Sequence, residues 1–290
     1  MAKKDDAYST DEENQWCPGC GNFAIRRALV MALEAAGVTP DRLVIASGIG
    51  QAPKMPHYVA CNGLDGIHGR ALPAALGAYL VDPTLTYVVV DGDGGAYAEG
   101  TNHFVHALRR NPRMVYLVHD NRVFGLTKGQ ASPTSDPDFK TKTSPRGTMM
   151  PPFNPLGVAI ANNGTFVARG YAGDVDHLAW LIGEALAHPG FAFVDVLQPC
   201  VSFNRVNTYK WYRQRVYKLE DRGHDPTDRA TAFELSFQWG EEIPTGVFYR
   251  TIRTTFHEQF TALDGGRRLD RSPLDSTTVR TEVLSAFRAK

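Results

Sequence analysis

The stretch Thr86 to Gly94, TYVVVDGDG, decides the fold of this chain. Its first part, up to Asp91, is a run of β-branched and apolar residues, which is typical of a central strand in a parallel sheet. The triplet Gly92-Asp93-Gly94 follows at the carboxyl end of that strand. Ligands of such sheets bind at the carboxyl ends of strands. The stretch therefore predicts a buried strand that leads directly into a functional site.

Helices and strands are expected to alternate on both sides of this stretch. Apolar residues at helical spacing predict helices over residues 22–36, 69–80, 97–110 and 175–188, with a further helix before residue 165. Apolar and β-branched runs predict strands over residues 43–46, 114–119, 165–169 and 191–197. Strands that alternate with helices form a doubly wound parallel sheet covered on both faces, which is an α/β fold.

The two ends of the chain depart from this alternation. Residues 1–15 are polar and predict a flexible tail, which leaves an α/β domain over residues 16–200. From residue 201 to 290 we expect an extension with peripheral helices over residues 209–219 and 228–239. Its last thirty residues are polar, and we expect them to wrap a partner or to be disordered. Within the domain, the long polar stretch 125–152 predicts a lid or a partner-binding loop.

Composition excludes several classes of function. The 290 residues include 31 basic and 31 acidic side chains, so no global basic charge favours nucleic acid or a membrane surface. The first fifteen residues lack the apolar run of a secretory signal, and we expect a cytoplasmic protein. Four cysteines are too few for a disulfide scaffold in a chain of this length, which favours metal or redox roles.

A carboxylate and an amide are expected at the ends of two successive strands. Asn121 follows Asp93 by 28 residues, and both side chains offer oxygen atoms of the kind that Mg²⁺ prefers. The backbone carbonyl of Val123 would be a third ligand. His68-Gly69-Arg70 stands where a strand hands over to a helix, so backbone N–H groups there could meet phosphate oxygens. The alternative is a tight turn at Gly92 to Gly95 and a polar loop at Asn121.

The cysteines form one close pair and two single residues. Cys17-Pro18-Gly19-Cys20 has the spacing that clamps a tetrahedral metal or one edge of an iron–sulfur cluster, although a redox dithiol has the same spacing. Cys200, after a predicted strand, is a candidate third ligand. Cys61, in a short apolar segment, is more simply explained as a small core residue.

Several motifs in fixed order resemble the β subunit of 2-oxoacid:ferredoxin oxidoreductases. They are Trp16 to Gly21 (WCPGCG), Ser47 to Gly50 (SGIG), His68 to Arg70 (HGR), Gly92 to Gly94 (GDG), Asn102-His103 and Asp120 to Gln130 (DNRVFGLTKGQ). The resemblance covers residues from about 14 to 250. Residues 212–219 and 243–249 look like the two-subunit members, which favours 2-oxoglutarate over pyruvate as substrate.

The resemblance implies cofactors, partners and site residues. The β subunit of this family binds thiamine diphosphate, Mg²⁺ and usually a [4Fe–4S] cluster. An α subunit completes the active site in an α2β2 heterotetramer, and the extension 201–290 would pack on it. The substrates would be a 2-oxo acid and coenzyme A, with ferredoxin as the electron carrier, in either direction. Asp93, Asn121 and Val123 would hold Mg²⁺, with Cys17, Cys20 and Cys200 on the cluster.

The remaining site residues follow from the same resemblance. The diphosphate would be lined by Gly92, Gly94, Gly95, His68, Gly69 and Arg70. Gly48-Ile49-Gly50, Gly125 and the loop Cys17-Pro18-Gly19-Cys20 would approach the reactive part of the cofactor. Leu126, Thr127 and Lys128 would lie at the distal end of the oxo acid. Lys128 could pair with a second substrate carboxylate, or it could be a solvated loop lysine.

One position departs from the family. The third cluster ligand of the family follows the Gly-Ile-Gly turn, and here that position is Gln51. An amide oxygen is a poor ligand for iron in a sulfide cluster. Either Cys61 replaces the missing thiolate, or the cluster is lost, incomplete or ligated from outside the chain.

Two other functions remain open from the sequence. A thiamine-dependent decarboxylase or carboligase without electron transfer would tolerate Gln51. A non-catalytic interaction module could bind zinc through Cys17 and Cys20. The second alternative gives Asp93 and Asn121 no role.

Overall fold

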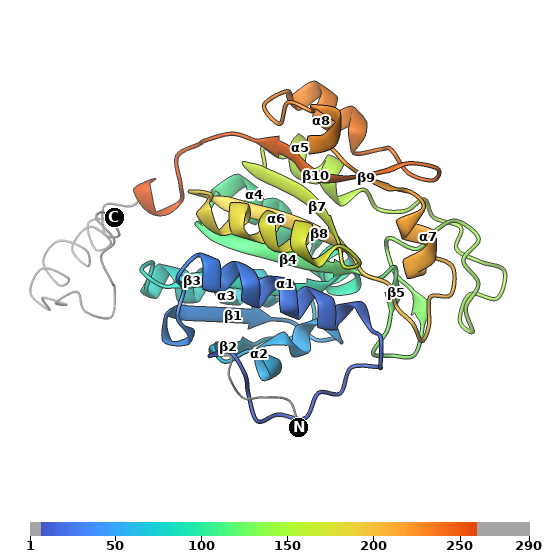
Figure 1. Cartoon of the computed structure of the whole chain (residues 1–290), viewed down its shortest axis with the longest axis horizontal. Coiled ribbons are helices and arrows are strands. Elements are labelled where there is room, and N and C mark those ends of the chain that lie inside the picture. The colour runs from blue at the N-terminus through green and yellow to red at the C-terminus, as the bar shows by residue number, and fades with distance from the viewer. Residues whose placement is uncertain (1–6, 260–290) are drawn as a thin grey trace, which may run out of the picture.

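A computed structural model describes residues 7–259, which form a central sheet with helices on both faces (Figure 1). The sheet has eight strands in the order β2-β1-β3-β4-β8-β7-β10-β9. They are β1 Leu43–Ser47, β2 Asn62–Asp65, β3 Thr86–Gly92, β4 Met114–Asp120, β7 Phe166–Tyr171, β8 Phe191–Leu197, β9 Val216–Lys218 and β10 Ile243–Arg250. The pair β5 Val123–Phe124 and β6 Gln130–Ala131 forms a separate small hairpin.

The six strands from β2 to β7 all run parallel, whereas β10 pairs antiparallel with β7. Within β3 the residues alternate between two cores, because successive side chains point to opposite faces of a strand. Val88 and Val90 belong to one core, and Val89 belongs to the other. Both faces are therefore apolar, and this explains the continuous apolar run from Tyr87 to Val90 in the sequence.

Helices cover each face of the sheet. The α-helices are α1 Gly21–Ala35, α2 Met55–Tyr58, α3 Ala71–Val81, α4 Thr101–Arg110, α5 Pro155–Ala161, α6 Val175–Ala187, α7 Tyr209–Arg213 and α8 Arg229–Leu235. The core beneath α1 and α6 includes Leu29 and Leu181. The core on the other face includes Leu72 of α3, Phe104 of α4 and Leu156 of α5. The predicted α/β fold with a mainly parallel sheet is confirmed.

The C-terminal part differs from the sequence-based expectation. The predicted helix over 209–219 was wrong in its second half, because α7 ends at Arg213 and the chain continues into strand β9. Strand β10, which extends the sheet beyond β7, was not expected from the sequence. The helix predicted over 228–239 exists as the shorter α8. The last thirty residues lie outside the described part of the chain.

The predicted N-terminal tail is packed against the domain where the structure describes it. Tyr8 is only 2% exposed, and its hydroxyl donates to the carbonyl of Val38. The backbone N–H of Ala60 donates to the carbonyl of Tyr8 at 2.9 Å. The part of the predicted tail around Tyr8 therefore contacts the domain, whereas residues 11–13 are exposed.

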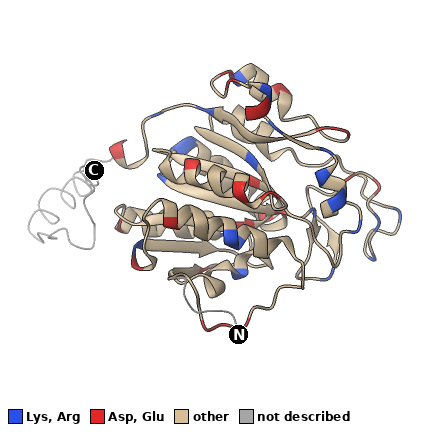
Figure 2. Ribbon diagram, in the orientation of Figure 1, with Lys and Arg blue, Asp and Glu red and all other residues tan. Residues whose placement is uncertain are grey.

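Charged residues are spread over the whole described chain. Figure 2 shows acidic and basic residues interspersed along helices and loops, in line with their equal numbers. None of the helices within residues 7–259 combines the length and the apolar character needed to cross a bilayer.

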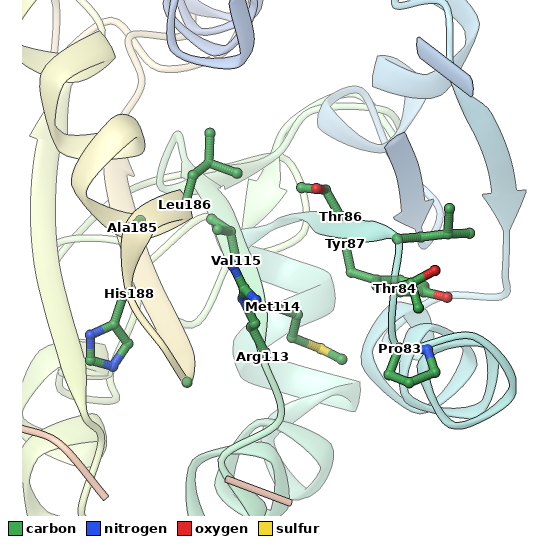
Figure 3. Close-up of a pocket in the computed structure, with 12 residues that line it drawn as sticks. Pro83, Thr84, Thr86, Tyr87, Arg113, Met114, Val115, Ala185, Leu186 and His188 are labelled. Carbon is green, nitrogen blue, oxygen red and sulfur yellow. The ribbon is translucent and has the colours of Figure 1, made fainter. Parts of the chain in front are cut away.

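The amino ends of β3, β4 and β8 border a cavity of about 140 Å³ (Figure 3). His188 lies on its wall and is 5% exposed, with Nε2 at 2.9 Å from the Thr165 hydroxyl. Burial, with a smaller contribution from the charge of Arg250, lowers the pKa of His188 to about 4. The twelve residues around this cavity include no carboxylate and no cysteine, so we assign it no catalytic role.

We expect His188 to make the folded chain sensitive to acid. An unfolded histidine titrates near pH ~6.5, so between about pH 6.5 and 4 the unfolded state binds more protons and stability falls as the pH falls. Between pH 7.5 and pH 5, His188 should lower the free energy of unfolding by on the order of 1–2 kcal/mol, and the His188→Gln variant should lack this decrease. Urea denaturation of both proteins at the two pH values measures this. Identical pH dependence in the two proteins would contradict the assignment.

Candidate functional site

A cavity of about 80 Å³ lies at the carboxyl ends of β3 and β4. These strands are neighbours, with Gly92 paired with His119, so the residues that follow each strand lie side by side. The structure brings together in this cavity most of the site residues expected from the sequence. They are Ile49, Gly50, His68, Gly92, Asp93, Gly94, Gly95, Asn121, Val123, Gly125, Leu126 and Thr127, joined by Gln51, Ala52 and Phe124.

Asp93 is a buried carboxylate in an environment short of positive charge. It is 1% exposed, and its Oδ2 lies 2.7 Å from the hydroxyl of Thr134. The same hydroxyl lies 2.7 Å from Oδ1 of Asp120, although it has only one proton to donate. Burial, and then the charge of Asp120, raises the pKa of Asp93 to about 8. Such a group needs a proton or a cation to be stable at neutral pH.

Asn121 and Val123 belong to one tight turn after β4. Oδ1 of Asn121 accepts the N–H of Val123 at 3.0 Å, and the backbone of Arg122 between them has a φ of 61°. That left-handed conformation is uncommon for a residue with a side chain. The Arg122 side chain holds it in place, because its guanidinium contacts Asp136 at 2.7 Å and lies 4.1 Å from the ring centre of Trp239.

At two glycines near this cavity there is no room for a side chain. A Cβ atom at Gly94 would lie 2.2 Å from the ring of Phe124, which no side chain could tolerate. Gly69 has a φ of 69° and lies two residues before α3. His68, next to it, lines the cavity and pairs with Glu99 at 3.2 Å. A residue of the cavity wall thus lies three residues before α3, and N–H groups at a helix start favour phosphate.

The donors present fit a magnesium diphosphate. Mg²⁺ takes oxygen ligands and retains phosphate oxygens among them. The buried carboxylate of Asp93 supplies the charge, while the Asn121 amide and the backbone at Val123 line the same cavity. The ion would also neutralise the carboxylates that share Thr134, because the nearby Arg122 and Arg169 form their ion pairs with Asp136 and Asp195.

A second cavity adjoins the first and is lined by three cysteines. Its walls include Cys17, Cys20, Cys200 and Gln51, together with Trp16, Asn121, Gly125, Gln198, Val201, Ser202 and Phe203. Sγ of Cys17 accepts the Ser202 hydroxyl at 3.1 Å, and Sγ of Cys20 accepts Nε2 of Gln198 at 3.3 Å. Burial raises the pKa of Cys20 to about 11, and Cys200 and Cys17 add to the increase because they lie nearby.

Cys61 does not line this cavity, so the structure does not support the first of the two explanations for Gln51, in which Cys61 replaces the missing thiolate. It immediately precedes β2, at the amino end of the sheet, where Asn62 pairs with Val44. Its thiol lies near the backbone of Ile45 and packs against the core beneath α1. It is a partly buried core residue, as the simpler explanation held.

Some expected residues lie outside the lining of both cavities. They are Pro18, Gly19, Gly48, Gly69, Arg70 and Lys128. Arg70 is exposed and donates to the carbonyl of Glu99 at 3.0 Å. Gly48 packs against Asp91, whose carboxylate a Cβ atom would approach to 2.6 Å. Lys128 is exposed on the hairpin between β5 and β6, directly after Leu126 and Thr127.

Three residues that contact the site residues without lining the cavity were not predicted from the sequence. Thr134 lies in the long polar stretch, where no spacing distinguishes it from neighbouring hydroxyl residues. Asp91 is 1% exposed, with Oδ1 buried and without a hydrogen-bond partner within the described chain. An acid inside an otherwise apolar strand was the available signal for it. Arg122 carried no comparable signal, because its left-handed φ and its partner Asp136 appear only in three dimensions.

Comparison with known proteins gives consistent results. Residues 44–196 match the family model of the C-terminal TPP-binding domain of thiamine pyrophosphate enzymes. Residues 200–265 match the model of the C-terminal part of the pyruvate ferredoxin oxidoreductase β subunit. The chain is 43% identical over 274 residues to a 2-oxoacid:ferredoxin oxidoreductase subunit β of Saccharolobus solfataricus, covering 90% of each chain.

Two further relatives are named for 2-oxoglutarate. A 2-oxoglutarate oxidoreductase subunit of Mycobacterium tuberculosis is 41% identical over 197 residues, which is 68% of this chain and 53% of that protein. A solved structure of 2-oxoglutarate:ferredoxin oxidoreductase from Magnetococcus marinus, with 2-oxoglutarate, coenzyme A and succinyl-CoA bound, matches with a TM-score of 0.87. It is 35% identical, and the match covers 94% of this chain and 93% of that one.

These matches span both the sheet domain and the C-terminal part. The alternatives of a zinc-binding interaction module and of a carboligase without electron transfer are therefore set aside. Together with the cavity at the ends of β3 and β4, the matches identify the chain as a thiamine diphosphate-dependent enzyme subunit that belongs to the β subunits of 2-oxoacid:ferredoxin oxidoreductases.

Proposed function

We propose that this chain, with an α subunit, catalyses the coenzyme A-dependent oxidative decarboxylation of 2-oxoglutarate, or the reverse reaction. The products are an acyl-CoA and carbon dioxide, and ferredoxin carries the electrons. The observation that carries the proposal is the cavity that Asp93, Asn121 and Val123 line together at the ends of two adjacent parallel strands. An α2β2 assembly provides two such sites.

In this proposal Asp93, the Asn121 amide and the Val123 carbonyl hold Mg²⁺ against the diphosphate of the cofactor. Gly94 lets the Phe124 ring pack directly against the backbone beside Asp93, since the ring fills the space that a side chain would take. The start of α3 at Ala71 would present N–H groups to the same anion. When bound, thiamine diphosphate supplies the electron sink for cleavage of the bond between the keto carbon and the carboxylate.

The chain's own residues bind and orient the cofactor, but none of those lining the cavity is an acid suited to activate its ring. Asp93 is the sole carboxylate among the lining residues, and its place is on the metal. The activating carboxylate is therefore expected from the α subunit. This division explains why a chain with a complete metal site should still need a partner.

The support for 2-oxoglutarate comes from the relatives and from the hairpin between β5 and β6. Leu126 and Thr127 line the cavity, and Lys128 is the next residue on the same turn. The hydroxyl of Thr127 donates to Oε1 of Gln130 at 2.5 Å, which closes the turn. A lysine held beside the cavity mouth would suit the second carboxylate of 2-oxoglutarate, a group that pyruvate lacks.

We expect Asp93→Asn to abolish most magnesium-dependent binding of thiamine diphosphate. The replacement keeps the shape but removes the one buried charge on the ion, so affinity should fall by about 100-fold or more, or ~3 kcal/mol. Titration calorimetry of the αβ complex with thiamine diphosphate and Mg²⁺ measures this. Asp41→Asn changes an exposed acid at the amino end of the sheet and serves as the matched control. Equal affinity in all three proteins would refute the metal assignment.

The chain purified without its α subunit should not oxidise 2-oxo acids. Since a general acid or base contributes at least about 100-fold, activity should be lower than that of the complex by at least that factor. The assay follows reduction of ferredoxin or of a viologen dye at saturating 2-oxoglutarate and coenzyme A. Full activity in the isolated chain would contradict the need for a partner.

Lys128→Ala should reduce the preference for 2-oxoglutarate over pyruvate by about tenfold, because a charge-assisted contact is lost for only one of the two substrates. The ratio of kcat/KM for the two substrates measures the change. Lys140→Ala, at another exposed lysine of the same polar stretch, is the control. A parallel fall for both substrates would show that Lys128 has no role in selecting the substrate.

A further inference from the structure

Three thiols, and not four, surround the cavity next to the cofactor site. Cys17, Cys20 and Cys200 line it, and the sulfur of Cys20 is close enough to both others for their charges to affect it. They come from the loop before α1 and from the segment after β8, which meet where the N–H of Gly21 donates to the carbonyl of Pro199 at 3.3 Å.

Two amide side chains, those of Gln51 and Gln198, line the same cavity, and Nε2 of Gln198 donates to Sγ of Cys20 at 3.3 Å. Gln51 lines the same cavity, and its Oε1 is buried without a hydrogen-bond partner within the described chain. Its backbone is held in place, because the indole N–H of Trp16 donates to the Gln51 carbonyl at 2.7 Å. The amide oxygen therefore stands beside the three sulfurs as an available but weak donor.

Other donors do not replace the missing thiolate. Cys61 precedes the amino end of β2, whereas the cofactor cavity lies at the carboxyl edge of the sheet. Along the strand, Cys61 is about 13 Å from Asp65, the residue of β2 at that edge. The Ser202 hydroxyl already donates to Cys17. A single ion is also a poor fit, because among residues 7–259 no group of three or more histidine, cysteine or acidic side chains converges tightly enough to hold one. A larger centre, with bridging sulfide between the thiolates, does not need all three side chains to converge on one ion.

We infer that this chain binds an iron–sulfur cluster through only Cys17, Cys20 and Cys200, and that the fourth iron, beside Gln51, is exchangeable. Thiolate is the ligand that iron in such clusters prefers, and an amide oxygen does not hold it firmly. A one-electron oxidant would then convert the centre without loss of sulfide: [4Fe–4S]²⁺ gives [3Fe–4S]⁺, Fe²⁺ and one electron, which the oxidant accepts.

The iron position without a thiolate ligand, beside Gln51, faces the cofactor site. Gln51, Asn121 and Gly125 line both cavities, so the wall between them is only one layer of residues thick at this point. The exchangeable iron would therefore lie on the side of the cluster that is nearest to the thiamine cavity. This inference rests on the proposed function only in taking the centre to be iron–sulfur, and its test does not depend on turnover.

The test uses the αβ complex purified without oxygen and titrated with one equivalent of ferricyanide. Iron and sulfide analysis and EPR spectroscopy follow the centre. We expect the near-isotropic EPR signal of an oxidised three-iron cluster, and release of about one iron per site with sulfide retained. Added Fe²⁺ and a reductant should restore the four-iron form.

Three variants make the result specific. Gln51→Cys supplies the fourth thiolate and should keep all iron after the same oxidation, without the three-iron signal. Cys61→Ser should behave as the wild type does, and Cys20→Ser should lose the centre. A wild-type cluster that retains four irons on oxidation would overturn the inference, as would loss of the cluster in Cys61→Ser, or zinc in place of iron and sulfide.

The outcomes also separate this inference from the proposed function. A three-iron centre in a complex that does not oxidise 2-oxo acids would contradict the proposed reaction and leave the inference intact. An active enzyme whose four-iron cluster resists oxidation would contradict the inference and leave the proposed reaction intact.

Discussion

One hydroxyl, that of Thr134, lies between two buried carboxylates at the carboxyl edge of the sheet. It is 2.7 Å from both Asp93 and Asp120, and one proton cannot satisfy both acids. Charge buried in this way destabilises a fold unless a cation accompanies it. In the proposed function, Mg²⁺ at this position would compensate the charge of the two carboxylates.

The rest of the molecule keeps that arrangement rigid. The turn that carries Asn121 and Val123 needs a left-handed Arg122, whose guanidinium is held by Asp136 from the long polar stretch and by Trp239 from the C-terminal part. Asn204, also from that part, donates to the carbonyl of Asn121 at 3.1 Å. The long polar stretch and the C-terminal part supply no predicted metal ligand, but their side chains fix the geometry of the turn that carries Asn121 and Val123.

The sequence predicted the features that depend on local pattern and on the rules of parallel sheets. The apolar run before Gly92 had to be a central strand, and Asp93 and Asn121 then had to follow strands whose ends meet at one edge. The strand β10 escaped prediction because Pro244 and Gly246 interrupt its pattern, and its antiparallel pairing with β7 needs no crossover helix. The burial of Tyr8 could not be predicted, because a single aromatic residue in a polar segment gives no hydrophobic periodicity.

Contacts between residues far apart in the sequence were the main limit on what could be predicted. Cys61 was assigned to the cluster by counting thiols, whereas sheet register places it at the wrong end of β2. Thr134 and Arg122 support the site through contacts that only the fold creates. The central claim concerns the ion itself, and anomalous diffraction from the αβ complex crystallised with Mn²⁺ and thiamine diphosphate tests it most directly. The account predicts a manganese peak, present above and absent below the manganese absorption edge, within coordination distance (about 2 Å) of oxygen atoms of Asp93, Asn121 and Val123. Manganese at another position, or bound cofactor without an ion between these residues, would contradict it.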